Sequence, residues 1–213
     1  MTNYSLTVKV PVQSFRQLSQ EGYKLCFASG VEREGFKVIA LTTGEALCSS
    51  TSTYTDVCDQ DIAPFVMLQC NDDYAIAASG SSFMEGAKVQ AYTNVDSIRL
   101  GQTYTLTPDF QGRVNDGGRQ GAIQFNNQTD RAAPIIYRSI GDSKVPFYVG
   151  SQQLPRGSSQ VIQPNNRVAV WFQRDAETGM MISRIDGNFI EIDMSGRTSA
   201  TVVSNEDFTW SLQ

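Results

Sequence analysis

Alternation of apolar and polar positions near the N-terminus predicts a β-strand. Leu6, Val8, Val10 and Val12 are separated by polar residues or proline. In an extended chain, side chains two apart share one face, so these four residues form an apolar face that is expected to pack on a core.

A short helix is expected to follow, over about residues 14–21. Ser14 begins a Ser-x-x-Gln pattern, which is the spacing of a capping box. Phe15 and Leu18 fall on one helical face, and Gly22 supplies the glycine that commonly ends a helix. No other segment of the sequence predicts a helix as convincingly.

The rest of the chain is predicted to consist of short strands and turns. The apolar runs are short and are separated by turn-forming residues. The expected strands are 23–27, 36–40, 66–70, 87–92, 103–106, 122–125, 134–138, 146–149, 167–172, 180–185, 189–193 and 199–203. Short strands at regular spacing are typical of a β-sandwich or a β-barrel.

A glycine-rich stretch divides the predicted strands into two sets. Residues 112–121 read GRVNDGGRQG, contain few apolar side chains, and are predicted to form a linker. The sequence therefore predicts an all-β protein built from two tandem, pseudo-repeated antiparallel β-sandwich units. The first is residues 1–111, which include the short N-terminal helix, and the second is residues 122–213.

The two predicted units resemble each other in the order of strands and turns. Residues 73–91 align with residues 166–184, which places Gly86 on Gly179. Literal identity is low, and any two arrays of β-hairpins align loosely. Residues 75–82 are mostly small, whereas the matching residues of the second unit, 168–175, are bulky. The surface formed by residues 75–82 is therefore expected either to pack tightly against another element or to line a cavity.

Composition excludes several classes of function. The 213 residues include no histidine, and 17 Lys+Arg against 22 Asp+Glu give a net charge of −5. Without histidine, a Ser-His-Asp or Cys-His centre and a histidine-containing zinc or iron site cannot form within the chain. An acidic chain without basic runs is not expected to bind nucleic acid or anionic lipid. No cofactor is expected.

The sequence also bears on compartment and redox state. No apolar run approaches the ~20 residues that span a bilayer, and no secretory signal pattern is seen, so we expect a cytoplasmic protein. Cys26, Cys48, Cys58 and Cys70 match no redox or zinc spacing and are expected to be reduced, partly buried thiols. Whether any of them pair in disulfides stays open.

The densest group of candidate ligand-binding residues follows one predicted strand. Trp171, Gln173, Arg174, Asp175 and Glu177 combine an aromatic ring with amide, guanidinium and carboxylate groups. Sugars are commonly held in this way, because their CH groups pack on the ring and their hydroxyls need several donors and acceptors. The alternative is a tryptophan between the two sandwiches beside a charged turn.

Two weaker candidates lie elsewhere. Tyr148 belongs to an aromatic strand followed by a polar turn, where it is suited either to ligand contact or to core packing. Asp56, Asp59 and Asp61 place carboxylates close together, which suits calcium, but the spacing of an EF-hand is absent. A solvated acidic loop is the simpler interpretation, and no metal is expected.

The leading hypothesis is a non-catalytic binding protein for a neutral small molecule or glycan, with carbohydrate the best fit. At the level of architecture the chain resembles lectin-like and cytolysin-like sandwiches, a resemblance that does not carry function. The alternatives are a metal-free enzyme of isomerase or cyclase type with a small apolar substrate, and a cytolysin-like membrane-active protein. Homo-oligomer formation is left open.

Overall fold

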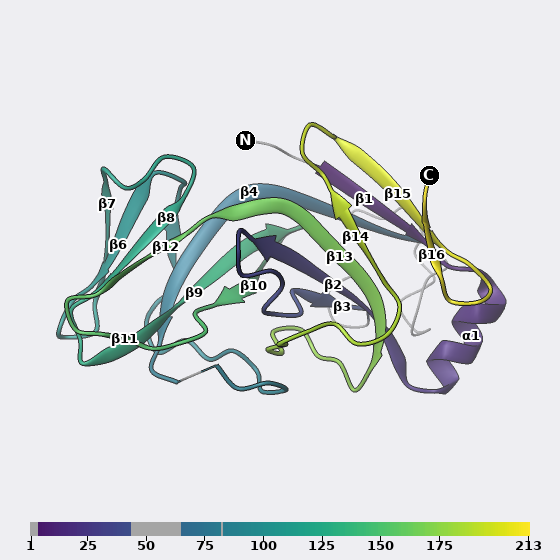
Figure 1. Cartoon of the computed structure of the whole chain (residues 1–213), viewed down its shortest axis with the longest axis horizontal. Helices are drawn as coiled ribbons and strands as arrows, with labels where there is room; N and C mark the ends of the chain where they lie inside the picture. Colours follow the sequence, from purple (N-terminus) through teal and green to yellow (C-terminus); the bar gives the residue numbers. More distant parts are fainter. Residues whose placement is uncertain (1–3, 44–64, 82) are drawn as a thin grey trace.

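The computed structural model describes residues 4–43, 65–81 and 83–213 (Figure 1). Strands account for most of this part of the chain, and one helix lies within it, α1 (Val12–Gln20), so the all-β class is confirmed. The strands are β1 (Tyr4–Lys9), β2 (Tyr23–Val31), β3 (Leu41–Thr42), β4 (Phe65–Ser79), β5 (Asp96–Ile98), β6 (Gln102–Leu106), β7 (Gly112–Asp116), β8 (Ile123–Asn127), β9 (Arg131–Ile140), β10 (Ser143–Val149), β11 (Leu154–Pro155), β12 (Ser159–Ile162), β13 (Pro164–Arg174), β14 (Phe189–Asp193), β15 (Ser199–Ser204) and β16 (Trp210–Leu212).

The predicted helix is present but begins two residues earlier than expected, at Val12. Pro11 precedes the first turn with φ −58°, and its carbonyl accepts a hydrogen bond from the Phe15 N–H at 2.9 Å. Because proline fixes φ, it starts the helix without a side-chain cap, and Ser14 makes no capping hydrogen bond. Gly22, at φ +77°, follows the end of the helix as predicted.

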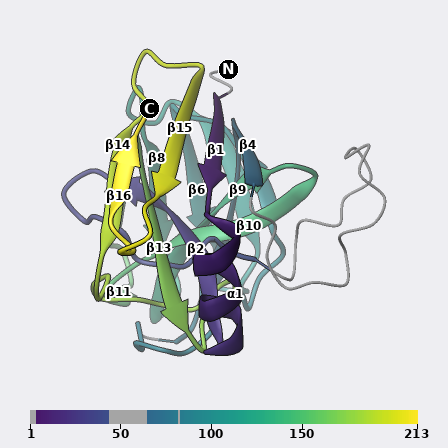
Figure 2. The same ribbon diagram turned by 90° about the vertical axis from the view of Figure 1, so that its right-hand side faces the viewer.

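The described strands form three sheets. The largest has the order β10-β9-β4-β1-β15-β16, with β5 also paired to β4 and β11 to β9. The two smaller sheets have the orders β12-β8-β6-β7 and β14-β13-β2-β3. All pairs are antiparallel except β1–β15 and β6–β8, which are parallel. The long strand β4 curves across the molecule (Figure 1), and α1 stands beside β2 at one end (Figure 2).

Strand pairing joins the parts of the chain that precede and follow the predicted linker. β1 pairs with β15, β2 with β13, and β4 with β9. Residues 112–116 within the predicted linker form β7, which pairs with β6. Since β6 also pairs with β8, all three sheets combine strands from both predicted units.

One hydrophobic core extends over all three sheets. It includes Leu6 on β1, Phe125 on β8 and Val170 on β13, each with no exposed surface. On the opposite face of β13, a second core contains Trp171 and Cys26. Because β13 is covered on both faces, its central residues form a continuous apolar run rather than an alternating one.

Three predicted strands, at 36–40, 87–92 and 180–185, are not strands in the structure. The three segments instead pair with one another through isolated bridges, of which Lys88–Met180 is one. Ile39 and Ile182 from these segments are buried in the second core. Their apolar character therefore reflects burial over β13 rather than membership of a continuous ladder.

Of the small residues at 75–82 that suggested either close packing or a cavity, residues 75–79 lie within β4, and residue 82 lies outside the described residues. Residues 75–79 pair with β5 and β9, and each has at most 4% of its surface exposed. Gly80, which follows directly, borders the cavity described below. In the part of the chain that the structure describes, no helix is long and apolar enough to cross a membrane.

Candidate functional site

Trp171, the central residue of the predicted site, is fully buried. Its indole ring lies in the second core with Cys26 and Ala28, and its Nε1–H donates a hydrogen bond to Gln173 Oε1 at 2.9 Å. The ring and the amide therefore satisfy each other inside the protein. A surface ligand does not reach the ring.

Among the charged residues of that predicted site, Arg174 and Asp175 are exposed and Glu177 is half-buried, and Arg174 and Glu177 pair with different partners. Arg174 Nη2 lies 3.1 Å from Glu21 Oε2, and Lys88 Nζ lies 2.5 Å from Glu177 Oε2. The hydrogen bond from Lys88 lowers the pKa of Glu177. Asp175 follows β13 with φ +53°. Among the described residues, no hydrogen bond or ion pair joins Arg174, Asp175 and Glu177 to one another.

Tyr148 lies in a separate polar cluster. Its hydroxyl donates to Glu34 Oε1 at 2.8 Å and accepts from Gln160 Nε2 at 2.8 Å, while Ser151 Oγ donates to Glu34 Oε2 at 3.1 Å. Burial raises the pKa of the Tyr148 phenol, with the Glu34 carboxylate adding to the effect. The cluster ties the turn after β2 to β10 and β12, so its groups are used in holding the fold.

A second buried polar cluster surrounds Arg138, which is 1% exposed. Its guanidinium donates to Tyr4 Oη, to the Asn71 carbonyl and to Asp72 Oδ1 at 3.1, 3.0 and 3.2 Å, and it lies over the Tyr74 ring. Burial raises the pKa of Tyr74 to about 12, so the phenol is neutral at pH 7. The cluster fixes the register shift between β4 and β9.

The weak metal candidates Asp56, Asp59 and Asp61 lie outside the described residues, as do Cys48 and Cys58. Cys26 and Cys70 are free and buried. Within the described ranges, no group of three or more cysteines and carboxylates is placed to hold a metal ion.

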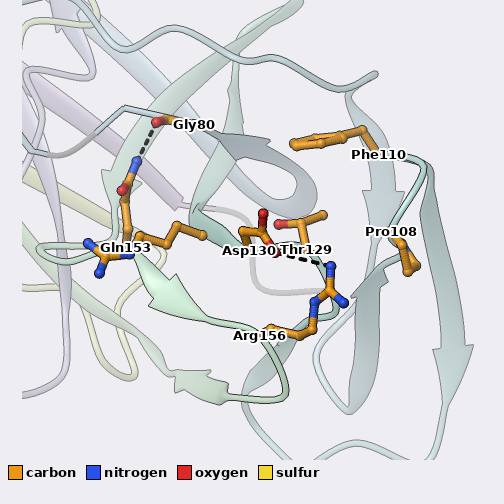
Figure 3. A pocket seen from close by; sticks show the side chains of 8 residues that line it. Gly80, Pro108, Phe110, Thr129, Asp130, Gln153 and Arg156 are labelled. Carbon is orange, nitrogen blue, oxygen red and sulfur yellow. Dashed lines mark hydrogen bonds and ion pairs between the residues drawn. The ribbon is translucent and has the colours of Figure 1, made fainter.

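The structure brings a different set of residues together around a cavity of about 370 Å³ (Figure 3). The cavity lies between the end of β4, the β6–β7 turn, the β8–β9 turn and both ends of β11. Its lining residues are Gly80, Pro108, Phe110, Thr129, Asp130, Arg131, Gln153 and Arg156. None of them belongs to the site predicted from the sequence.

Asn127, just outside the cavity, holds one of its walls in place. This side chain is 1% exposed, and its Oδ1 accepts from the backbone N–H and the hydroxyl of Thr129 at 2.9 and 2.7 Å. Its Nδ2 donates to the carbonyls of Thr129 and Leu154 at 3.1 and 2.7 Å. Since all four hydrogen-bonding positions of the amide are used, the β8–β9 turn is fixed to β11.

Phe110 forms the opposite wall from a tight turn. The Thr107 N–H donates to the Gln111 carbonyl at 2.9 Å, and the Thr107 hydroxyl bonds Asp109 Oδ1 at 2.5 Å, which lowers the pKa of Asp109. Phe110 itself has φ +58° and remains 49% exposed, with its ring directed toward the cavity (Figure 3). A left-handed backbone costs a side-chain-bearing residue about 1–2 kcal/mol.

The remaining walls carry charges and an amide. Arg156 Nη2 lies 3.1 Å from Asp130 Oδ1, and its backbone N–H donates to the Asp130 carbonyl at 3.2 Å. Gln153 Nε2 donates to the Gly80 carbonyl (Figure 3). Arg131 forms no ion pair with any residue that the structure describes.

This arrangement offers an aromatic surface beside fixed hydrogen-bond donors and acceptors. Chemically it suits a polar ligand that also has an apolar face. In comparisons with known proteins, no family model matches the chain, and neither a curated protein nor a solved structure matches it. The functional assignment therefore depends on the geometry of the cavity.

Proposed function

We propose that the protein is a non-catalytic carbohydrate-binding protein and that the cavity beside Phe110 is its binding site. The observation that carries the proposal is Phe110: a half-exposed aromatic ring on a left-handed backbone, facing a polar cavity. At such a turn position glycine or asparagine avoids the backbone cost. Strained residues of this kind cluster at functional sites, where the side chain is needed.

The chemistry of the lining supports a sugar over an apolar molecule. Five of the eight lining residues are polar or charged, and their groups include hydroxyl, amide, carboxylate and guanidinium. A sugar ring places CH groups on an aromatic face and directs its hydroxyls to such groups. The cavity volume of about 370 Å³ lies at the lower end of the range for small-ligand sites.

Preorganisation is the second support. Asn127 fixes the Thr129 turn, and the Asp130–Arg156 pair has two contacts, one through side chains and one through the backbone. Groups that are already in place lose little conformational freedom when a ligand binds. This arrangement favours selective binding of small polar molecules over the proposed alternatives of apolar-substrate catalysis and membrane activity.

The test is a screen of neutral and acidic oligosaccharides on an array, followed by titration calorimetry with the best binder. We expect Phe110→Gly to weaken binding at least tenfold. The free energy of unfolding is expected to change by no more than ~1 kcal/mol, because relief of backbone strain offsets the added flexibility of glycine.

The chain supplies a matched control in a second turn of the same kind. Phe208 has φ +61°, and the turn at 205–209 repeats the two backbone hydrogen bonds of the turn at 107–111. Asp207 stands in the place of Asp109, and its carboxylate accepts from the Thr209 hydroxyl at the end of the turn. Phe208 does not line the cavity. Phe208→Gly should therefore bind as the wild type does. Absence of glycan binding by the wild type, or full binding by Phe110→Gly, contradicts the proposal.

The pseudo-repeat expected from the sequence, with its two sandwich units, also stays a proposal. What supports it is the pair of similar hairpins, β6–β7 and β15–β16, each closed by an Asp-Phe turn. No residue of the second Asp-Phe turn, at 205–209, lines the cavity, so this turn serves as a control for the first.

A further inference from the structure

We infer that the bound sugar carries a carboxylate group and that Arg131 receives it. The inference deepens the proposed function and rests on it, because it concerns the same cavity. It names the class of ligand as acidic sugars, whereas the sequence suggested a neutral one.

The charges in the cavity wall do not balance. Arg131 and Arg156 supply two positive charges, and Asp130 supplies one negative charge. Asp130 pairs with Arg156 at 3.1 Å. Arg131 has no carboxylate partner within the described residues, so the wall has an excess of one positive charge.

This local excess stands out against the charge of the whole chain. The protein has 22 acidic and 17 basic residues, so carboxylates are abundant. Exposed charges farther apart than about 8–10 Å are largely screened at physiological salt. The overall charge of −5 therefore opposes an acidic ligand only weakly, and the nearby guanidinium decides the preference.

Guanidinium chemistry favours a carboxylate over the hydroxyl groups that every sugar carries. Arginine presents its N–H donors in a planar fork that pairs with both oxygens of a carboxylate. A hydroxyl offers only one oxygen to this fork and carries no charge. A uronic acid keeps the sugar ring that packs on Phe110 and adds a carboxylate at C6, so it uses both features of the cavity.

The experiment compares sugars that differ only at C6. The probes are the methyl glycosides of glucose and galactose and of the corresponding uronic acids, titrated into the full chain at low salt. We expect each uronic acid to bind about tenfold more tightly than its neutral partner. We also expect this ratio to fall as sodium chloride is added, because the charges are exposed.

Variants separate the role of Arg131 from that of net charge. Arg131→Met should remove the preference for the acid, so that each uronic acid and its neutral partner bind with similar affinity, and Arg131→Lys should retain only part of the preference, since lysine lacks the planar fork. Arg99→Met lowers the net charge equally at an exposed position that does not line the cavity, and it should keep the full preference. Circular dichroism verifies that each variant is folded.

The outcomes distinguish the inference from the proposed function. Equal, Phe110-dependent binding of acids and neutral sugars overturns the inference and leaves the carbohydrate site standing. Tighter binding of a sulfated sugar than of the uronic acid overturns the carboxylate assignment. Failure of every sugar to bind overturns both. A preference for the acid that survives Arg131→Met overturns the assignment to Arg131.

Discussion

The indole ring of Trp171 fills the space between β13 and the segments 36–40 and 180–185. It has no exposed surface, and its only polar atom is bonded to Gln173 at 2.9 Å. Truncation of such a ring removes its buried contacts and leaves a cavity. In this position tryptophan stabilises the packing of the second core.

We therefore expect Trp171→Ala to lower the free energy of unfolding by about 3–5 kcal/mol. Trp171→Phe should cost less, because most of the ring volume remains. Urea denaturation followed by circular dichroism measures both values. Retention of sugar binding by Trp171→Phe is the accompanying check. A Trp171→Ala variant with wild-type stability and no sugar binding would mean that the indole contacts the ligand.

Trp171 and Phe110 differ in how much of their surroundings the sequence predicts. Alternation along a strand indicates which residues share a face, but it does not indicate which other segment covers that face. The sequence therefore predicts a ligand contact at Trp171, although both faces of its strand are buried. A signal for Phe110 does exist in the sequence, since a large aromatic residue follows Pro-Asp in a turn-forming stretch. It is weak, because positive φ cannot be derived from the residue type.

At the scale of elements, one amide holds the β8–β9 turn to β11. Asn127 accepts two hydrogen bonds from Thr129 and donates one to the Leu154 carbonyl, all within a buried environment. Although Asn127 does not line the cavity, it sets the position of the wall that carries Asp130. Its effect on binding should therefore act through the order of the turn.

Asn127→Ala leaves buried backbone groups without partners, and we expect a loss of about 2–3 kcal/mol in stability. The Thr129 amide should exchange its hydrogen faster, and sugar affinity should fall because the wall is no longer preorganised. Hydrogen exchange by NMR and titration calorimetry measure the two effects. Asn127→Asp separates the two sides of the amide, since its carboxylate can still accept from Thr129 but can no longer donate to the Leu154 carbonyl. Unchanged exchange at Thr129 together with unchanged affinity contradicts this role.

Elements with a clear local signal were predicted well, and those that depend on distant partners were not. The strand of Leu6 and Val8 and the helix ending before Gly22 follow from periodicity and local turn chemistry. The runs at 36–40 and 180–185 have the same apolar character, yet they form only isolated bridges over the second core. Their conformation depends on contacts far apart in the sequence, which a local pattern does not contain.

At the scale of the whole molecule, three long pairings connect the early and late parts of the chain. β1 pairs with β15, β2 with β13 and β4 with β9, and the main core includes residues from all of these strands. Cutting the chain at the predicted linker removes a hydrogen-bonded neighbouring strand from each strand of these three pairs. It also exposes the apolar faces that those strands bury.

This arrangement yields a test of the division proposed from the sequence. Residues 1–111 and 122–213, expressed separately, should not unfold cooperatively, because unpaired edges of β1, β2 and β4 invite aggregation and the shared core is lost. Circular dichroism during heating, together with light scattering, measures this behaviour. Mixing the two fragments during refolding should restore a cooperative transition and sugar binding. Cooperative unfolding of either fragment alone would show instead that the pairings across the linker only join two units, each with enough core of its own to fold.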